Sequence, residues 1–223
     1  ADHTFGNQAF SCPILASQAT ADNMRACLLT YWHRDIIKKE MDEEPAMAEA
    51  WRDLKITLPT DAFDREKSFD FKGLSVILKK VGGHTNDSSI VFFPDFKTLF
   101  CGDIVFNRIY PTLLRHDGHP FKLIEVLKGL LVMDIDTIVP GHGAVGDKSI
   151  VEKSIDYWVC LTGKIRQHID DHLDDKRIRE KILGECRLGG IPFNKRRHQK
   201  NVDSVIFFLR KQLNAACSRT QAI

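Results

Sequence analysis

The stretch LFCGDIVF (residues 99–106) sets the interpretation of the rest of the chain. It is rich in aromatic and β-branched residues and carries Asp103 directly after Gly102, as expected for a buried strand that presents a polar side chain at its end. The stretch DTIVPGHG (residues 136–143) shows the same pattern, a short apolar run followed by a glycine turn that contains His142. Glycines at such points let the backbone turn sharply without a Cβ clash. The two stretches therefore predict strands that bring Asp103 and His142 to the sheet's loops.

Two further sites show the same arrangement of polar ligand-type residues. GGHTNDSS (residues 82–89) places His84 after the apolar run LSVILKKV, and Asp2 and His3 stand together at the beginning of the chain. Loops held by a rigid sheet are where catalytic and binding residues concentrate. The sequence thus offers five candidate ligands at four turn-like sites, namely Asp2, His3, His84, Asp103 and His142.

The order of the predicted elements indicates an α/β fold. Apolar spacing predicts helices over about 22–42, 45–54, 121–132, 148–173, 175–183 and 199–216. Strands are predicted at SFDF, LSVILKKV, SSIVFFP, TLFCGD and DTIVPGHG. Strands in the middle of the chain with helices on both sides imply one layered α/β domain over residues 1–223. The helical segment at about 20–60 is expected to form part of a substrate pocket or a lid.

The composition narrows the function classes. The chain has 223 residues, 43% hydrophobic and 28% charged, with a net charge of +2. This balance gives no support for a nucleic-acid partner, and no apolar run reaches the ~18–20 residues of a membrane span. The cysteines are scattered without a C-x-x-C spacing, at positions Cys12, Cys27, Cys101, Cys160, Cys186 and Cys217. That spacing argues against a disulfide framework or a zinc ribbon and fits a reducing, cytoplasmic location.

Together, the four sites resemble the metallo-β-lactamase superfamily, the αβ/βα metallohydrolases that include glyoxalase II and many lactonases. ADH (residues 1–3) matches the last three positions of the family's H-x-H-x-D-H loop, and His84, Asp103 and His142 follow at separations of 19 and 39 residues. The resemblance implies a four-layered αβ/βα sandwich. Because the first two histidines of the loop do not precede ADH, we expect the chain to begin within the motif and to lack the N-terminal strands of the sandwich. The missing strands and histidines then belong to a longer form of this protein or come from another chain.

The resemblance also implies a set of metal ligands. By the family pattern, Asp2, His3 and His142 hold one metal, His84 belongs to the other, and Asp103 bridges the two. Two zinc ions per full-length chain are expected. A bridging carboxylate is a harder ligand than the thiolate of a Cys, so iron or manganese are also possible metals. A carboxylate at this position also points away from a true β-lactamase.

The implied reaction is hydrolysis of a carbonyl ester, thioester, lactone or lactam by a hydroxide that bridges the two metals. Asp2 is expected to act catalytically by orienting this hydroxide as well as binding metal. Tyr110, in FNRIYP, is a candidate donor to a substrate carbonyl, although packing in the core with a satisfied hydroxyl is the preferred role. The apolar face of the N-terminal helices favours a small hydrophobic substrate.

Other functions fit the same pattern. A mononuclear-iron sulfur dioxygenase of this scaffold uses two histidines and an aspartate, and a non-catalytic domain could retain the fold. A nucleic-acid-processing member would need a broad basic face, which this chain does not show. The sheet edge left by missing strands favours a homo-oligomer.

The remaining histidines are expected at the surface, five in helices or loops and one in the solvated start of the last helix. They are His33, His116, His119, His168, His172 and His198.

Overall fold

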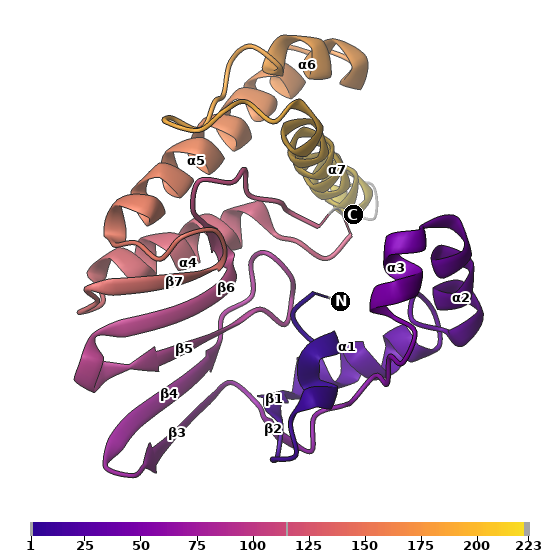
Figure 1. The fold of residues 1–223 in the computed structure, drawn as a ribbon. Coiled ribbons are helices and arrows are strands. Elements are labelled where there is room, and N and C mark those ends of the chain that lie inside the picture. The colour runs from indigo at the N-terminus through magenta and orange to yellow at the C-terminus, as the bar shows by residue number, and fades with distance from the viewer. Residues whose placement is uncertain (1, 115, 221–223) are drawn as a thin grey trace. The chain divides into compact units, whose positions relative to one another are not determined.

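The computed structural model describes residues 2–114 and 116–220 (Figure 1). The chain divides into two compact units, residues 1–67 and residues 68–223, with the boundary inside one strand. The expectation of a single domain stays a prediction. In the described part of the chain, no helix has both the length and the apolar character to cross a membrane.

Unit 1 is mainly helical. Its elements are the 3-10 helix η1 (Phe5–Ala9), strands β1 (Leu15–Ser17) and β2 (Asp61–Phe63), and helices α1 (Gln18–Leu28), α2 (Arg34–Glu43) and α3 (Pro45–Ala50). The short strands β1 and β2 pair in parallel. Neither was predicted from the sequence. Phe5 makes edge-on ring contacts with Trp32 and Trp51, so aromatic packing ties the 3-10 helix to the helical part of the unit.

The helix predicted over about 22–42 is in fact two helices. The first ends at Leu28, and the N–H of Trp32 turns back to the Cys27 carbonyl at 2.8 Å. His33 then caps the second helix, with its Nδ1 accepting from the Asp35 N–H at 3.5 Å. A side chain that satisfies one of the unpaired N–H groups at a helix start stabilises a new helix at that point, which the continuous apolar spacing did not reveal.

Unit 2 is built on a five-stranded sheet in the order β3-β4-β5-β6-β7. The strands are β3 (Glu66–Phe71), β4 (Leu74–Lys80), β5 (Ser89–Phe93), β6 (Thr98–Phe106) and β7 (Thr137–His142), with the 3-10 helix η2 (Pro94–Phe96) between β5 and β6. The helices are α4 (Pro120–Val132), α5 (Lys148–Asp170), α6 (Asp175–Ile182) and α7 (Lys195–Thr220). Antiparallel pairing joins β4, β5 and β6, whereas β6 and β7 are parallel because α4 forms the connection between them.

The core of unit 2 lies between the sheet and helices α4 and α5 (Figure 1). Along β6, Leu99 and Cys101 are fully buried, whereas Phe100 between them is 45% exposed, as the two-residue period of a strand requires. Leu127 of α4 and Trp158 of α5 are fully buried in the same core. This packing holds β6, which carries Asp103, against the core of unit 2, and β7, which carries His142, pairs with it in parallel.

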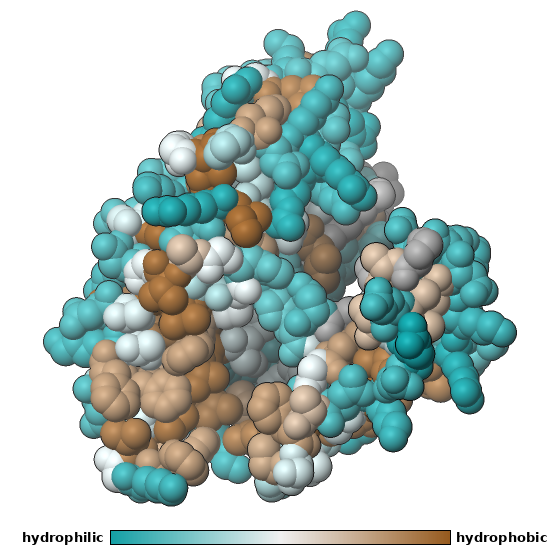
Figure 2. Space-filling model, in the orientation of Figure 1, coloured by the Kyte–Doolittle hydropathy of each residue, from teal (hydrophilic) through white to brown (hydrophobic). Residues whose placement is uncertain are grey.

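Apolar side chains gather on the strands of this sheet in the space-filling view (Figure 2). The exposed aromatic residues of unit 2 include Phe69, Phe71, Phe96 and Phe100. Phe93 meets Phe100 edge-on at 5.8 Å between ring centroids. Because Phe100 points away from the core side chains of β6, part of this aromatic cluster belongs to the sheet face opposite α4 and α5.

A disulfide joins Cys160 of α5 to Cys186, in the segment between α6 and α7. The scattered cysteine spacing gave no sign of this pair, so the expectation that these two cysteines stay reduced is wrong for the structure. The bridge closes a loop that contains the whole of α6, and two cysteines 26 residues apart carry no local signal of pairing.

Candidate metal centre

Two parallel strands bring Asp103 and His142 together. Asp103 lies in the second half of β6 and His142 is the last residue of β7, and the ends of parallel strands meet at one edge of a sheet. Gly141 permits the close approach, because a Cβ there would clash with Oδ1 of Asp103 and would meet the Gly102 carbonyl carbon at 2.6 Å. The glycine before His142 therefore has a steric reason.

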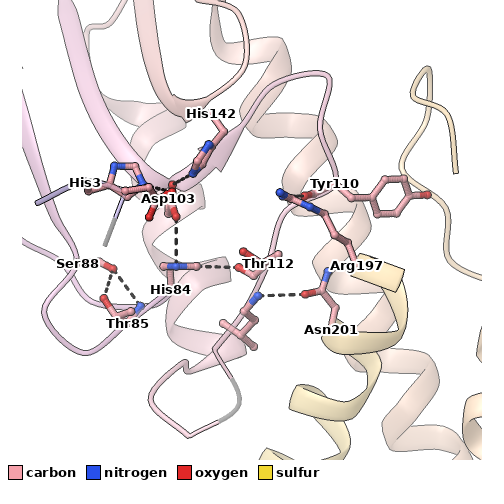
Figure 3. A network of polar contacts seen from close by, with 12 residues as sticks. His3, His84, Thr85, Ser88, Asp103, Tyr110, Thr112, His142, Arg197 and Asn201 are labelled. Atoms are coloured by element: carbon pink, nitrogen blue, oxygen red, sulfur yellow. Dashed lines mark hydrogen bonds and ion pairs between the residues drawn. The ribbon is translucent and has the colours of Figure 1, made fainter. Parts of the chain in front are cut away.

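His84 reaches the same place from the loop after β4. Gly82 and Gly83 have φ angles of +70° and +106°, which glycine adopts without strain. A Cβ on Gly83 would lie 2.9 Å from Cα of Leu123, so the loop packs directly against α4. Across the loop, the Thr85 and Ser88 hydroxyl oxygens lie 2.7 Å apart in a hydrogen bond, which fixes its far side (Figure 3).

The two histidines address different oxygens of one carboxylate (Figure 3). Nε2 of His84 lies 3.5 Å from Oδ2 of Asp103, and Nε2 of His142 lies 3.3 Å from Oδ1. The side chain of Asp103 is 17% exposed, so the carboxylate lies in a partly dry position between the two rings. Unit 2 thus brings together three of the five predicted ligands, His84, Asp103 and His142.

Each ring is oriented by a neighbour. Nδ1 of His84 lies 2.7 Å from the carbonyl oxygen of Thr112. A carbonyl oxygen can only accept, so Nδ1 carries a proton, and in the neutral imidazole the lone pair is then on Nε2, the nitrogen that faces Asp103. The His142 ring stacks on Phe106 at 5.3 Å between centroids and an interplanar angle of 10°. Both imidazoles are therefore held with Nε2 toward the carboxylate.

The donor set and its spacing fit a divalent metal. Charge-assisted hydrogen bonds between imidazole nitrogen and carboxylate are about 2.7–2.9 Å long, and both N···O distances here exceed that range. Two ligands held at ~2.0–2.1 Å on one tetrahedral ion lie about 3.3 Å from each other. Histidine nitrogen with carboxylate oxygen is a common zinc ligand set, and a backbone carbonyl on the second ring nitrogen is the usual partner of a metal-binding histidine.

The other two predicted ligands lie in unit 1. Asp2 and His3 stand in the turn before η1, both side chains are largely exposed, and Oδ2 of Asp2 is 3.7 Å from Nε2 of His3. Their assignment as ligands, and the catalytic role of Asp2, stay predictions.

Cys101 lies two residues before Asp103 but is not a ligand candidate. Its side chain is fully buried on the core side of β6, and burial raises the pKa of the thiol to about 12, although hydrogen bonds from the backbone oppose this. The thiol therefore stays protonated and donates to the Val139 carbonyl at 3.3 Å.

Tyr110 is buried in the core of unit 2. Its hydroxyl accepts from the N–H of Leu188 at 3.1 Å, and its ring packs edge-on against Tyr157 and Phe193. The packing role preferred in the sequence analysis matches this position. A substrate contact would require a ring that is 2% exposed to leave its site.

Two histidines expected at the surface are buried instead. Nε2 of His168 lies 3.4 Å from Oε1 of Glu185. His198 is fully buried, with Nδ1 3.0 Å from the Tyr157 hydroxyl and Nε2 3.3 Å from the Ile182 carbonyl. Burial, supported by the nearby charge of Arg187 and opposed by the bond to Ile182, lowers the pKa of His198. The other four are exposed as expected, namely His33, His116, His119 and His172.

Comparison with known proteins supplies the family. The sequence model of the metallo-β-lactamase superfamily matches residues 25–142, which is more than half of the chain. The chain belongs to the metallo-β-lactamase superfamily. The matched range contains His84 and Asp103 and ends at His142. No curated protein sequence matches the chain.

Solved structures of metallo-β-lactamase-fold proteins share the architecture. A metallo-β-lactamase family protein from Thermus thermophilus is 11% identical, with a TM-score of 0.59 over 92% of this chain and 68% of that protein. A stereoselective inverting sec-alkylsulfatase from Pseudomonas sp. is also 11% identical, with a TM-score of 0.50 over 68% of this chain. The chain spans only 26% of the alkylsulfatase, so this likeness concerns the fold and carries no activity. The predicted α/β metallo-β-lactamase fold is confirmed.

Proposed function

We propose that this chain is a metal-dependent hydrolase whose metal centre includes His84, Asp103 and His142. The observation that carries the proposal is the convergence of two histidine Nε2 atoms on the two oxygens of one carboxylate, at 3.5 and 3.3 Å. Membership of the metallo-β-lactamase superfamily supports a divalent metal at this position. The orientation of the His84 ring by the Thr112 carbonyl supports it independently of the family.

The proposal extends to the ligands predicted in unit 1. On the family pattern, Asp2 and His3 join His142 on one ion, His84 belongs to the second ion, and Asp103 contributes one oxygen to each. The distribution of the two Asp103 oxygens between the two rings supports the bridging role. Zinc is the proposed metal. Iron and manganese are the alternatives that a site rich in oxygen ligands would also accept.

The roles of the protein groups follow from their geometry. A divalent metal bound there supplies a Lewis acid and lowers the pKa of a coordinated water. Asp103 provides negative charge at a fixed place, because β6 is packed on the core and Gly141 leaves room for the carboxylate. His84 keeps its proton on Nδ1, and His142 is held flat against Phe106. The proposed substrates are carbonyl esters, thioesters, lactones or lactams, with Asp2 orienting the attacking oxygen.

Elemental analysis and a substrate screen on the full-length protein test this function. The chain should contain zinc after purification and should hydrolyse a member of a panel of thioesters, lactones, lactams and carboxylic esters. Asp103→Asn should lose metal and activity. The matched control is Asp95→Asn, because this carboxylate also belongs to unit 2 but bonds the Ser75 N–H at 2.7 Å, away from the candidate ligands.

Two results would overturn the hydrolase proposal. One iron per chain with oxygen consumption on a sulfur substrate would assign the mononuclear-iron sulfur dioxygenase alternative. A chain that folds, binds no divalent metal and turns over none of the panel would assign a non-catalytic domain.

A further inference from the structure

The main chain between β6 and α4 receives a row of hydrogen bonds from one face of α7. Arg197, Asn201 and Ser204 are spaced four and three residues apart, so they lie on the same side of the helix. Arg197 Nη1 donates to the Tyr110 carbonyl at 2.9 Å, Asn201 Nδ2 to the Pro111 carbonyl at 2.8 Å, and Ser204 Oγ to the Leu113 carbonyl at 2.9 Å. This face of α7 thus binds the carbonyls on both sides of Thr112.

The Thr112 carbonyl is used differently. It accepts from Nδ1 of His84, as described above. The same peptide group supplies the N–H of Leu113, which donates to Oδ1 of Asn201 at 3.0 Å. The structure contains no cis peptide bond among its described residues, and the C=O and N–H of a trans peptide point in opposite directions. One peptide plane therefore connects Asn201 on one side with His84 on the other (Figure 3).

The amide of Asn201 is itself fixed. The residue is fully buried, and its Nδ2 has a second acceptor in the Tyr157 hydroxyl at 3.0 Å. Because the Leu113 N–H can only donate and the Pro111 carbonyl can only accept, the side-chain oxygen of Asn201 has to face Leu113, and a flipped amide would lose both of these bonds. Nε2 of His198 faces the Ile182 carbonyl, which can only accept, so Nε2 carries the ring proton and the Tyr157 hydroxyl donates a hydrogen bond to Nδ1. The network ends on main chain and is satisfied throughout.

We propose that Asn201 is a positioning residue for the metal centre. It clamps the Thr112–Leu113 peptide so that the Thr112 carbonyl holds the proton of His84 on Nδ1 and leaves Nε2 as the metal-binding atom. Hydrogen bonds in such a chain polarise one another, so the bond that the Leu113 N–H donates to the Asn201 oxygen strengthens the Thr112 carbonyl as an acceptor. The inference rests on the proposed metal centre, and it adds a residue of α7 that lies far from the ligands in sequence.

The first test reads the His84 tautomer in the metal-free chain. Nitrogen-15 NMR of the imidazoles, at a pH where histidine is neutral, should show wild-type His84 with the proton on Nδ1 alone. Asn201→Leu, which removes all three bonds, should give a mixture of tautomers. Asn201→Asp retains an oxygen to accept from the Leu113 N–H, and its protonated carboxyl group can donate to the Pro111 carbonyl in place of Nδ2, so this variant should keep the wild-type tautomer. Leu209→Ala is the control for loss of packing on α7. Leu209 is buried like Asn201, but its side chain is apolar and makes no hydrogen bond.

The second test is zinc affinity, measured by competition with a chromogenic chelator. Asn201→Leu should bind zinc about 10- to 100-fold more weakly, the usual effect of removing a partner of a metal ligand. Leu209→Ala should bind zinc like the wild type. If Asn201→Leu keeps a single Nδ1–H tautomer at His84 together with wild-type zinc affinity, the positioning role is wrong. If Asn201→Leu does not fold, Asn201→Asp provides the test. A mixture of His84 tautomers in Asn201→Asp would contradict the positioning role of Asn201.

The two proposals fail separately. The tautomer measurement uses neither metal nor substrate. It therefore tests the positioning role of Asn201 even in a chain that proves to have no hydrolase activity. Failure of the wild-type chain to bind zinc would overturn the proposed function. The effect of Asn201 on the His84 tautomer would then still be decided by the NMR measurement.

Discussion

Loss of the Cys160–Cys186 disulfide is predicted to lower the free energy of unfolding by about 3.5 kcal/mol. The two cysteines are 26 residues apart. Closing a loop of that length removes about 12 cal/mol/K of chain entropy from the unfolded state, which corresponds to about 3.5 kcal/mol at 25 °C. The loop contains α6 and the segment whose Leu188 N–H bonds the Tyr110 hydroxyl. The bridge therefore stabilises the attachment of α6 to the core of unit 2.

Urea unfolding of the double variant Cys160→Ala/Cys186→Ala measures the effect. The oxidised wild-type chain should unfold at a higher urea concentration than the variant. Reductant should lower the wild-type midpoint to that of the variant and leave the variant unchanged. Cys12→Ala is the control, since Cys12 is exposed in unit 1 and takes no part in the bridge. If non-reducing mass spectrometry of the wild-type chain finds free thiols at Cys160 and Cys186, or if its urea midpoint is the same with and without reductant, the disulfide does not stabilise the fold.

Three further predictions concern the candidate centre and the buried network. His142→Ala should remove one of two zinc-binding events in a calorimetric titration, and unchanged stoichiometry would make His142 a turn residue only. Gly141→Ala should weaken zinc binding, because its Cβ would displace Asp103; Gly129→Ala, which opens onto free space in α4, should bind zinc normally. Because burial lowers the pKa of His198 below its usual 6.5, the unfolded chain takes up a proton first as the pH falls. Stability should therefore decrease below about pH 6.5, and His198→Gln should show a weaker decrease in its urea midpoint over that range.

The five strands of unit 2 and the places of His84, Asp103 and His142 beside them were predictable from sequence because their signals are local. A short apolar run followed by glycine and a polar residue marks Asp103 and His142, and the structure brings both to one edge of the sheet with His84. The long helix α5 was also predictable from its apolar period, since it begins at Lys148 as expected. In these segments the local pattern and the tertiary environment agree.

The network behind the site was not predictable, because its partners are far apart in sequence. Asn201 bonds residues 88 and 90 positions away, and His198 bonds Tyr157 at a separation of 41. In the sequence, the polar residues of α7 follow a basic run, and this pattern predicts a solvent-exposed helix surface. Only the packing of α7 against α5 and against the segment before α4 turns them into a buried hydrogen-bonded face.

The most direct test of the metal centre is a crystal structure of the chain soaked with zinc, with anomalous data recorded at the zinc edge. We expect an anomalous peak within ~2.0–2.2 Å of a carboxylate oxygen of Asp103 and of Nε2 of His84 or His142. The Nδ1 atom of His84 should still face the Thr112 carbonyl. A peak at other residues, or histidine rings that stay around Asp103 with no zinc bound at a saturating concentration, would contradict the central claim.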